Sequence, residues 1–228
     1  MTTPVPPTAY RRPLVEWRGR RPVPYITAWS GEVDVSINDL RYGARGLIYA
    51  NELPSDRDQR GGLWERWVDD YGTGEPAWRN VHSERQRTCM EQMWCQVCAR
   101  PASRTHKGYL FLAGGPATLG DMEGTPNGQP PLCLECAPTA RKLCPHLRES
   151  VAFRARKAPV WGVLGSLIAL ERSRLNPEAV RLRRSVPEFV KDGSRERPFV
   201  LGSQLLREMR RVTVVDLDAE LAAAGLTA

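Results

Sequence analysis

The sequence predicts an α+β protein built around one small zinc-binding module. Two Cys-x2-Cys pairs, Cys95 with Cys98 and Cys133 with Cys136, have the spacing of ligands for a single metal ion. Short β-branched and apolar runs lie on both sides of these pairs, and a pattern typical of a helix occurs near the C-terminus. The 228 residues contain no apolar stretch of about 18 residues, so we expect no membrane span.

Four segments are expected along the chain. Residues 1–13 are proline-rich and predict a disordered tail. Residues 14–94 predict an N-terminal α+β segment packing on the zinc module, which itself occupies residues 95–147. Residues 148–228 predict a C-terminal α+β segment. The flanking segments look too small to bury a core of their own, so we expect them to pack with the zinc module into one compact body.

In the N-terminal segment, residues 25–29 and 33–37 are short β-like runs that predict a hairpin. Residues 46–50 predict a further strand. Ser83 is a plausible N-cap for a helix that extends to about residue 93.

Residues 107–112 predict a strand of a hairpin. Residues 113–131 contain five glycines and four prolines and predict a long loop. Residues 137–147 have the composition of a helix, and residues 151–156 and 159–164 predict strands.

Residues 187–198 resemble a charged linker, and residues 199–202 predict a strand. Residues 203–211 fit a helix capped by Ser203. Residues 212–217 are β-branched, and we expect a last helix that Asp216 or Asp218 caps and Gly225 ends.

The two cysteine pairs point to structural Zn²⁺. Zinc favours four soft donors in a tetrahedron, and two cysteines three positions apart can supply two of them from one tight turn. Four thiolates leave no open position on the metal, so the ion is expected to stabilise the fold and not to act as a catalyst. The order of knuckle, hairpin and second pair opening a helix is that of a treble-clef or zinc-ribbon-like finger.

The remaining cysteines and the histidines have no assigned role. A buried thiol is the simplest interpretation of Cys89 and Cys144, and Cys144 with His146 is the best reserve ligand source. His82 precedes a predicted helix, which favours a loop or capping role. We identify no catalytic and no cofactor-binding residue other than the metal ligands.

The block from Cys95 to Cys136 resembles the zinc frame of phage recombination endonucleases of the endonuclease VII type, within the HNH group. That resemblance implies an Asp-His or His-His pair on the hairpin, with a later Asn or His. Here the hairpin offers only His106, and the nearest acids, Asp121 and Glu123, and Asn127 lie further along. The whole chain also resembles actinobacterial proteins found near phage-derived or mobile DNA.

The formal net charge of +7 permits a nucleic-acid partner. Only four of the 33 basic residues are lysines, and such an arginine bias also arises from a GC-rich genome. The aromatic residues between 64 and 78 are interleaved with Arg66 and Arg79, which suits either a small core or base stacking. Arg181, Arg183 and Arg184 form a basic patch for which a solvated face is the default interpretation.

The sequence therefore predicts a non-catalytic, zinc-stabilised binding or adaptor protein. Its expected partner is nucleic acid, or a protein in a phage-like or mobile-element complex. The alternative is a metal-dependent nuclease of the HNH type with a rearranged site around His106, His82 and His146. Six cysteines without a secretory leader suggest a reducing, cytoplasmic location.

Overall fold

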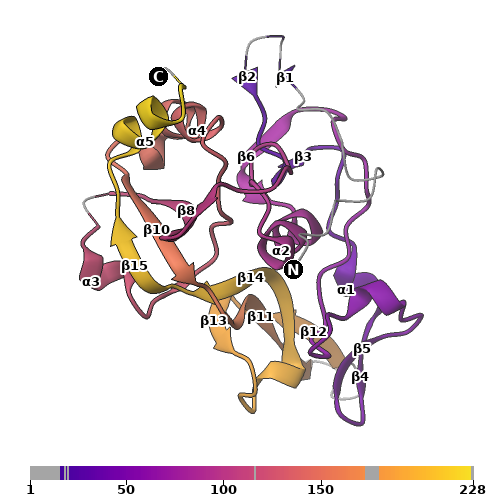
Figure 1. Cartoon of the computed structure of the whole chain (residues 1–228). Helices are drawn as coiled ribbons and strands as arrows, with labels where there is room; N and C mark the ends of the chain where they lie inside the picture. Colours follow the sequence, from indigo (N-terminus) through magenta and orange to yellow (C-terminus); the bar gives the residue numbers. More distant parts are fainter. Residues whose placement is uncertain (1–15, 18, 20, 116, 173–179, 227–228) are drawn as a thin grey trace. The chain divides into compact units, whose positions relative to one another are not determined.

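The computed structural model describes residues 16–17, 19, 21–115, 117–172 and 180–226 (Figure 1). The expected tail at residues 1–13 lies outside this part. The chain is mixed α+β and consists mostly of strands, as predicted. It divides into two compact units, each assembled from separate stretches of sequence. Unit 1 contains residues 1–27, 85–160 and 207–228, and unit 2 contains residues 28–84 and 161–206. The four-segment division along the chain stays a prediction.

A four-stranded antiparallel sheet is the framework of unit 1. Its strands, in order, are β15 (Arg210–Val214), β10 (Val151–Lys157), β8 (Gly108–Ala113) and β7 (Arg104–Thr105). Successive side chains of a strand point to opposite faces. Leu110 and Leu112 therefore enter one core, and Phe111 enters another, where its ring stacks on Phe153 at 5.4 Å.

Helices and short strands complete unit 1. The first core contains the cysteine pairs and the last helix, and the second contains Met122 and Met209. The elements are β1 (Glu16–Trp17), β2 (Arg21–Pro22), most of α2 (Ser83–Gln92), α3 (Leu119–Met122), β9 (Pro126–Asn127), α4 (Ala137–Leu143), η3 (Pro145–Leu147) and α5 (Leu217–Ala223).

Unit 2 is built around a different sheet. Strand β11 (Val160–Arg172) lies between β14 (Val200–Glu208) on one side and β12 (Val180–Arg184) and β13 (Glu188–Lys191) on the other. Its core joins this sheet to the hairpin of β4 (Leu40–Gly43) and β5 (Gly46–Tyr49). The remaining elements are β3 (Thr27–Trp29), which pairs with β6 (Pro76–Val81), α1 (Ser36–Asp39), η2 (Pro54–Asp56) and η4 (Arg197–Phe199).

Several elements occur where the sequence predicts them. Helix α2 begins at Ser83, and β5, β8 and β10 match the strands expected near residues 46–50, 107–112 and 151–156. The Asp216 carboxylate accepts hydrogen bonds from the N–H groups of Asp218 and Ala219, which confirms it as the cap of α5. Gly225 follows that helix with φ of 70°, a conformation that favours glycine.

The helix predicted over residues 203–211 is wrong. This segment belongs to β14 and to the beginning of β15. Leu201, Leu205 and Leu206 have the spacing of a helical stripe, but all three are buried in a strand that is covered on both faces. The Ser203 hydroxyl donates to the carbonyl oxygen of Leu164 at 2.9 Å instead of capping a helix.

Three further expectations are corrected. The hairpin of residues 25–29 with 33–37 does not form, because β3 pairs with β6 and Ser36 begins α1. The Asp34 carboxylate accepts the backbone N–H of Ser36, which favours a turn there over a strand. The loop expected at 113–131 contains α3 and β9, and the linker expected at 187–198 contains β13.

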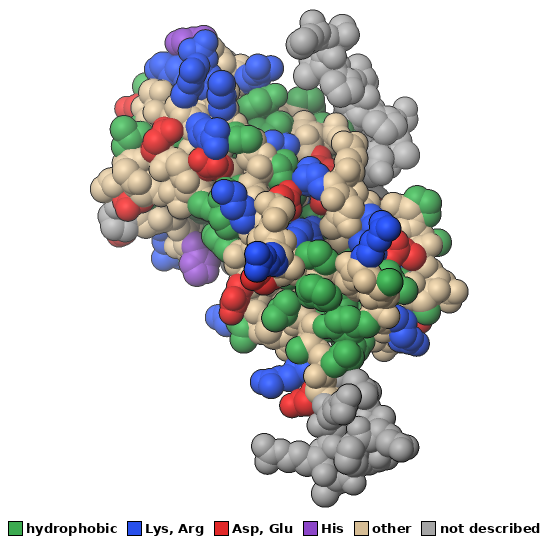
Figure 2. Space-filling model, turned by 90° about the horizontal axis from the view of Figure 1, so that it is seen from below, with side chains coloured by type: hydrophobic (Ala, Val, Ile, Leu, Met, Phe, Trp, Pro, Cys, Tyr) green, Lys and Arg blue, Asp and Glu red, His purple; other side chains and the backbone are tan. Residues whose placement is uncertain are grey.

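Charged side chains of both signs are interspersed on the face of the molecule shown in Figure 2. Hydrophobic side chains also reach the surface there. Among the exposed apolar residues are Leu167 and Leu170 of β11 and Phe189 of β13. No described helix is both long and apolar enough to cross a bilayer.

Candidate metal centre

The first cysteine pair sits in a tight turn after α2. The N–H of Ala99 donates to the carbonyl of Cys95 at 2.9 Å, and the N–H of Cys95 donates to the carbonyl of Arg100 at 2.7 Å. Ala99 adopts φ of 53°, which is uncommon for a residue with a side chain. These bonds close the turn so that the Cys95 and Cys98 side chains face the same side.

The second pair opens helix α4. The N–H groups of Cys136 and Ala137 both donate to the carbonyl of Cys133, at 3.3 and 3.2 Å. Cys136 is the residue before the helix, and Pro138 lies in the first turn, where its missing N–H costs nothing. The turn therefore directs both thiols to one side of the helix start.

Backbone hydrogen bonds hold the two turns together. The N–H of Gln96 donates to the carbonyl of Pro131 at 3.1 Å. Leu132, just before the second pair, is bonded to the hairpin. Its N–H donates to the Leu110 carbonyl in β8, and its carbonyl accepts the N–H of Ser103, both at 2.9 Å. The hairpin β7–β8 thus positions the second turn against the first.

The four sulfurs meet in one cluster. The Sγ atoms of Cys95, Cys98, Cys133 and Cys136 all lie within 4.8 Å of one another, and those of Cys98 and Cys133 are 3.7 Å apart. Four sulfurs bound at about 2.3 Å to a central ion lie roughly 3.8 Å apart. A disulfide would instead place two sulfurs about 2.05 Å apart. All six cysteines are free, so the cluster is compatible with one tetrahedral metal ion.

The local electrostatics favour the negative form of one thiol. Hydrogen bonds from Cys133 and Cys136 lower the pKa of Cys98, and the Arg100 guanidinium, 3.4 Å from its Sγ, lowers it further. The same contact raises the pKa of Arg100. Arg100 also forms an exposed ion pair with Glu135 at 2.9 Å, so it bridges the two cysteine turns.

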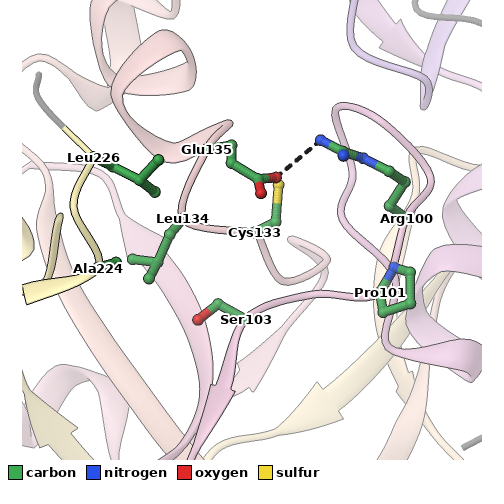
Figure 3. Close-up of a pocket in the computed structure, with 8 residues that line it drawn as sticks. All are labelled: Arg100, Pro101, Ser103, Cys133, Leu134, Glu135, Ala224 and Leu226. Carbon is green, nitrogen blue, oxygen red and sulfur yellow. Dashed lines mark hydrogen bonds and ion pairs between the residues drawn. The ribbon is translucent and has the colours of Figure 1, made fainter.

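An open pocket of about 470 Å³ adjoins this bridge (Figure 3). Glu135, Cys133 and Ser103 lie near the centre of the view, Arg100 lies to the right, and Leu226 of the C-terminal segment lies to the left. Of the four cysteines in the cluster, Cys133 lines this pocket.

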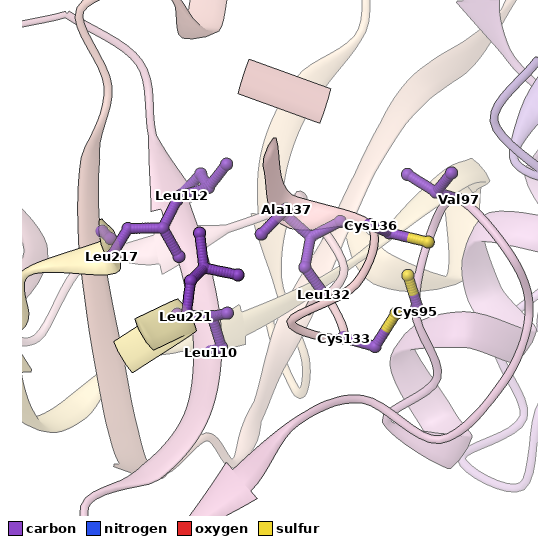
Figure 4. Packing of buried hydrophobic residues seen from close by; sticks show 11 residues of the cluster. Cys95, Val97, Leu110, Leu112, Leu132, Cys133, Cys136, Ala137, Leu217 and Leu221 are labelled. Carbon is purple, nitrogen blue, oxygen red and sulfur yellow. The ribbon is translucent and has the colours of Figure 1, made fainter. Parts of the chain in front are cut away.

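The cluster is part of the hydrophobic core of unit 1. Figure 4 shows the sulfurs of Cys95, Cys133 and Cys136 turned toward one another, with Leu110 and Leu221 farther along the same packed layer. Three of the four cysteines are buried, and Cys98 is half-buried. Metal binding would therefore join the two turns of this core directly.

The other two cysteines lie outside the cluster. Cys89 is buried in α2, and desolvation raises the pKa of its thiol well above the ordinary value. Cys144 is half-buried at the end of α4. Neither Cys144 nor His146 joins the four-sulfur group in the described part of the chain.

The histidines are dispersed. His106 is exposed in the turn between β7 and β8, and His146 is exposed in η3. His82 is buried in unit 2, with its ring 5.0 Å from the ring of Trp67 and its Nε2 3.9 Å from Glu32. Among the described residues of unit 1, neither His106 nor His146 belongs to a group of metal-ligating side chains.

The polar residues beyond the hairpin have local structural roles. Hydrogen bonds from Thr118 lower the pKa of Asp121, which caps α3. Glu123 accepts the N–H groups of Arg211 and Val212, and Asn127 accepts the N–H of Gln129. None of these contacts places a carboxylate beside His106.

The aromatic and arginine-rich candidates differ in burial, and Arg183 is exposed, as the default interpretation of its patch expects. Trp64 is buried, and Arg66 lies over the ring of Tyr49 at 4.0 Å, which favours the core interpretation of this cluster. Trp78 differs, because 53% of it is exposed on β6. Arg184 is bound by Asp34 at 2.6 Å and by Glu65.

Sequence reasoning missed two arginines of unit 1. Arg100 bridges the cysteine turns, and the fully buried Arg154 binds Glu220 through its Nη2 at 2.6 Å. The sequence pattern of residues 151–156 correctly predicted a strand, but it does not show which of its two arginines is buried. Only the residues that surround a strand show which arginine is internal.

Comparisons with family models, characterised proteins and solved structures find no match to this chain.

Proposed function

We propose that the four-cysteine cluster holds one structural zinc ion in a treble-clef module. Its support is the set of four sulfurs that lie within 4.8 Å of one another, two from the turn after α2 and two from the turn that opens α4, with the β7–β8 hairpin between them in the sequence. Bound zinc would cross-link the two turns of the unit 1 core. Because four protein sulfurs fill its coordination shell, no position remains for a metal-activated water.

Metal analysis of the purified chain tests this assignment. The expected content is one zinc per chain, and Cys98→Ser should reduce it strongly because one of four thiolates is lost. Cys144→Ser is the matched control, since this half-buried cysteine lies outside the cluster. Equal zinc loss in both variants, or a chain that takes up no zinc, contradicts the assignment.

We further propose that the protein is a non-catalytic binding protein whose partner is nucleic acid, alone or in a phage-like complex. The closed sulfur cluster carries the non-catalytic part of this proposal. The net charge of +7 supports an anionic partner. Exposed basic residues at one end of the unit 1 sheet that have no carboxylate partner in the described part of the chain support the same choice.

Filter binding of labelled duplex DNA, single-stranded DNA and RNA over a range of salt concentrations tests the partner. Contacts to phosphates release counterions, so the affinity should fall steeply as salt rises. Affinity that does not depend on salt, or no binding to any of the three, overturns the proposal. Cleavage of plasmid DNA with Mg²⁺ or Mn²⁺, lost in His106→Ala, would instead favour the nuclease alternative.

A further inference from the structure

One end of the unit 1 sheet collects basic side chains from three separate parts of the sequence. We call this surface the basic sheet end, and it consists of Arg104, His106, Lys107, Arg156, Lys157, Arg210 and Arg211, all exposed. Strand pairing brings them together. Lys157 lies opposite Arg210, and Arg104 lies opposite Tyr109, whose neighbour Gly108 contacts the backbone of Ala155 and Arg156.

The positive charge here is only partly neutralised. Among the described residues, no carboxylate forms an ion pair with Arg104, Lys107, Arg156 or Lys157. Glu208 pairs with Arg210 at 2.8 Å, and Glu123 lies at the Arg211 backbone. Elsewhere in the molecule Arg57, Arg66, Arg141, Arg154 and Arg184 all pair with carboxylates.

A local surplus of cations of this kind is the electrostatic signature of a surface for a polyanion.

The backbone beneath these cations is fixed. Gly108 has φ of 111°, and a Cβ there would come within 2.0 Å of the Ala155 carbonyl oxygen, so the turn lies directly against β10. The buried Arg154 donates to the carbonyl oxygens of Gly108 at 2.9 Å and Ser103 at 3.3 Å. A backbone that is already fixed loses less conformational entropy on binding, which favours affinity.

We propose that the basic sheet end binds the phosphate backbone of duplex DNA. This inference rests on the proposed nucleic-acid function and assigns it to one surface. Sites for single strands combine cations with aromatic side chains that stack on bases. Tyr109, the aromatic residue at this surface, is half-buried and lies beneath the Arg104 guanidinium, 5.2 Å from its ring centre. Contacts to phosphates without base stacking suit a duplex, which carries one charge per ~1.7 Å of its axis.

Fluorescence anisotropy with a short labelled duplex tests this assignment on the full chain. The test variant combines Lys107→Gln, Arg156→Gln and Lys157→Gln. The control combines Lys142→Gln, Arg148→Gln and Arg195→Gln, three exposed basic residues outside the basic sheet end, and removes the same total charge. Each lost phosphate contact lowers the salt slope by about 0.9, so the test variant should lose a slope of about 2 to 3 and bind at least roughly tenfold more weakly.

The control should keep nearly the wild-type slope and affinity. Equal weakening of both variants would show a diffuse charge effect and overturn the assignment while leaving the nucleic-acid function intact. Wild-type affinity in the test variant, or tighter binding of single-stranded DNA than of duplex, would also overturn it. A wild-type chain that binds no nucleic acid at all removes the proposed function itself, and the assignment with it. Circular dichroism confirms that all variants are folded.

Discussion

The two units are stabilised by different chemistry. Every one of the six cysteines belongs to unit 1, where four of them form the sulfur cluster. Unit 2 contains no cysteine. Both units have hydrophobic cores and arginine–carboxylate pairs, and in unit 2 these pairs include Arg66 with Asp56 and Arg184 with Asp34. One chain thus contains a unit with a candidate metal site and a unit whose described polar contacts involve no such cluster.

Removing the metal should produce the largest difference between the units. A four-thiolate zinc site contributes on the order of 10 kcal/mol, as much as the whole stability of a typical domain. We expect chelation, or Cys136→Ser, to expose the amides of β8 and β10 to hydrogen exchange while those of β4 and β5 stay protected. Mass spectrometry of peptides reads both units in one experiment. Cys144→Ser should leave the exchange protection of both units unchanged. Equal loss of protection in the two units after chelation would refute the idea that only unit 1 needs the metal.

Arg154 should have the next largest effect. Its replacement by Met would leave Glu220 and the carbonyls of Ser103 and Gly108 without this guanidinium partner. Breaking a buried charged network costs about 3–5 kcal/mol. Arg156→Met, two residues along the same strand and exposed, should change stability by less than about 0.5 kcal/mol. Urea denaturation of the zinc-loaded chain measures the free energy of unfolding of both variants. Similar losses of stability in the two variants would contradict an internal role for Arg154.

A smaller effect is expected from the ion pairs of unit 2. The Arg66 side chain is 18% exposed, and its Nη2 lies 2.6 Å from Asp56. Arg66→Met should therefore destabilise unit 2 by about 1–2 kcal/mol. Arg57→Met, which removes a more exposed pair with Glu52, should cost under about 1 kcal/mol. Hydrogen exchange in β4 and β5 distinguishes the two, and a larger effect in unit 1 would show that the units are coupled.

The smallest effect near neutral pH should be acid sensitivity of unit 2. Burial acts to raise the pKa of Asp56 and Asp58, but hydrogen bonds from Arg66 and from the Gly62 N–H outweigh it, so both lie below the ordinary value. A depressed folded pKa gives stability that is present above the unfolded pKa of about 3.9 and is lost as pH falls through the folded value. Unit 2 should thus keep its exchange protection down to about pH 4 and lose it below. Loss well above that pH would show that other groups control it.

The cysteine pairs and the strand patterns could be found in the sequence because each is local. Two cysteines three positions apart require only one turn, and the apolar residues and arginines of residues 151–156 lie in one short window of sequence. The fold of residues 203–211 could not be found, because burial of β14 on both faces comes from distant residues and overrides a helix-like spacing. The basic sheet end was missed for a related reason. Its residues come from positions 104–107, 156–157 and 210–211, and no window of sequence contains them together.

The chain enters and leaves each unit more than once, and this affects the order in which the protein can fold during synthesis. All four cysteines have left the ribosome once residue 136 is clear, yet β15 and α5, which complete the unit 1 sheet and its core, are made from residues 210–223. Unit 2 has all its residues by 206. The unit with the four-cysteine cluster therefore has its cysteines early in synthesis but is completed last. Leu110 and Leu132 are not covered until Leu217 and Leu221 have been made.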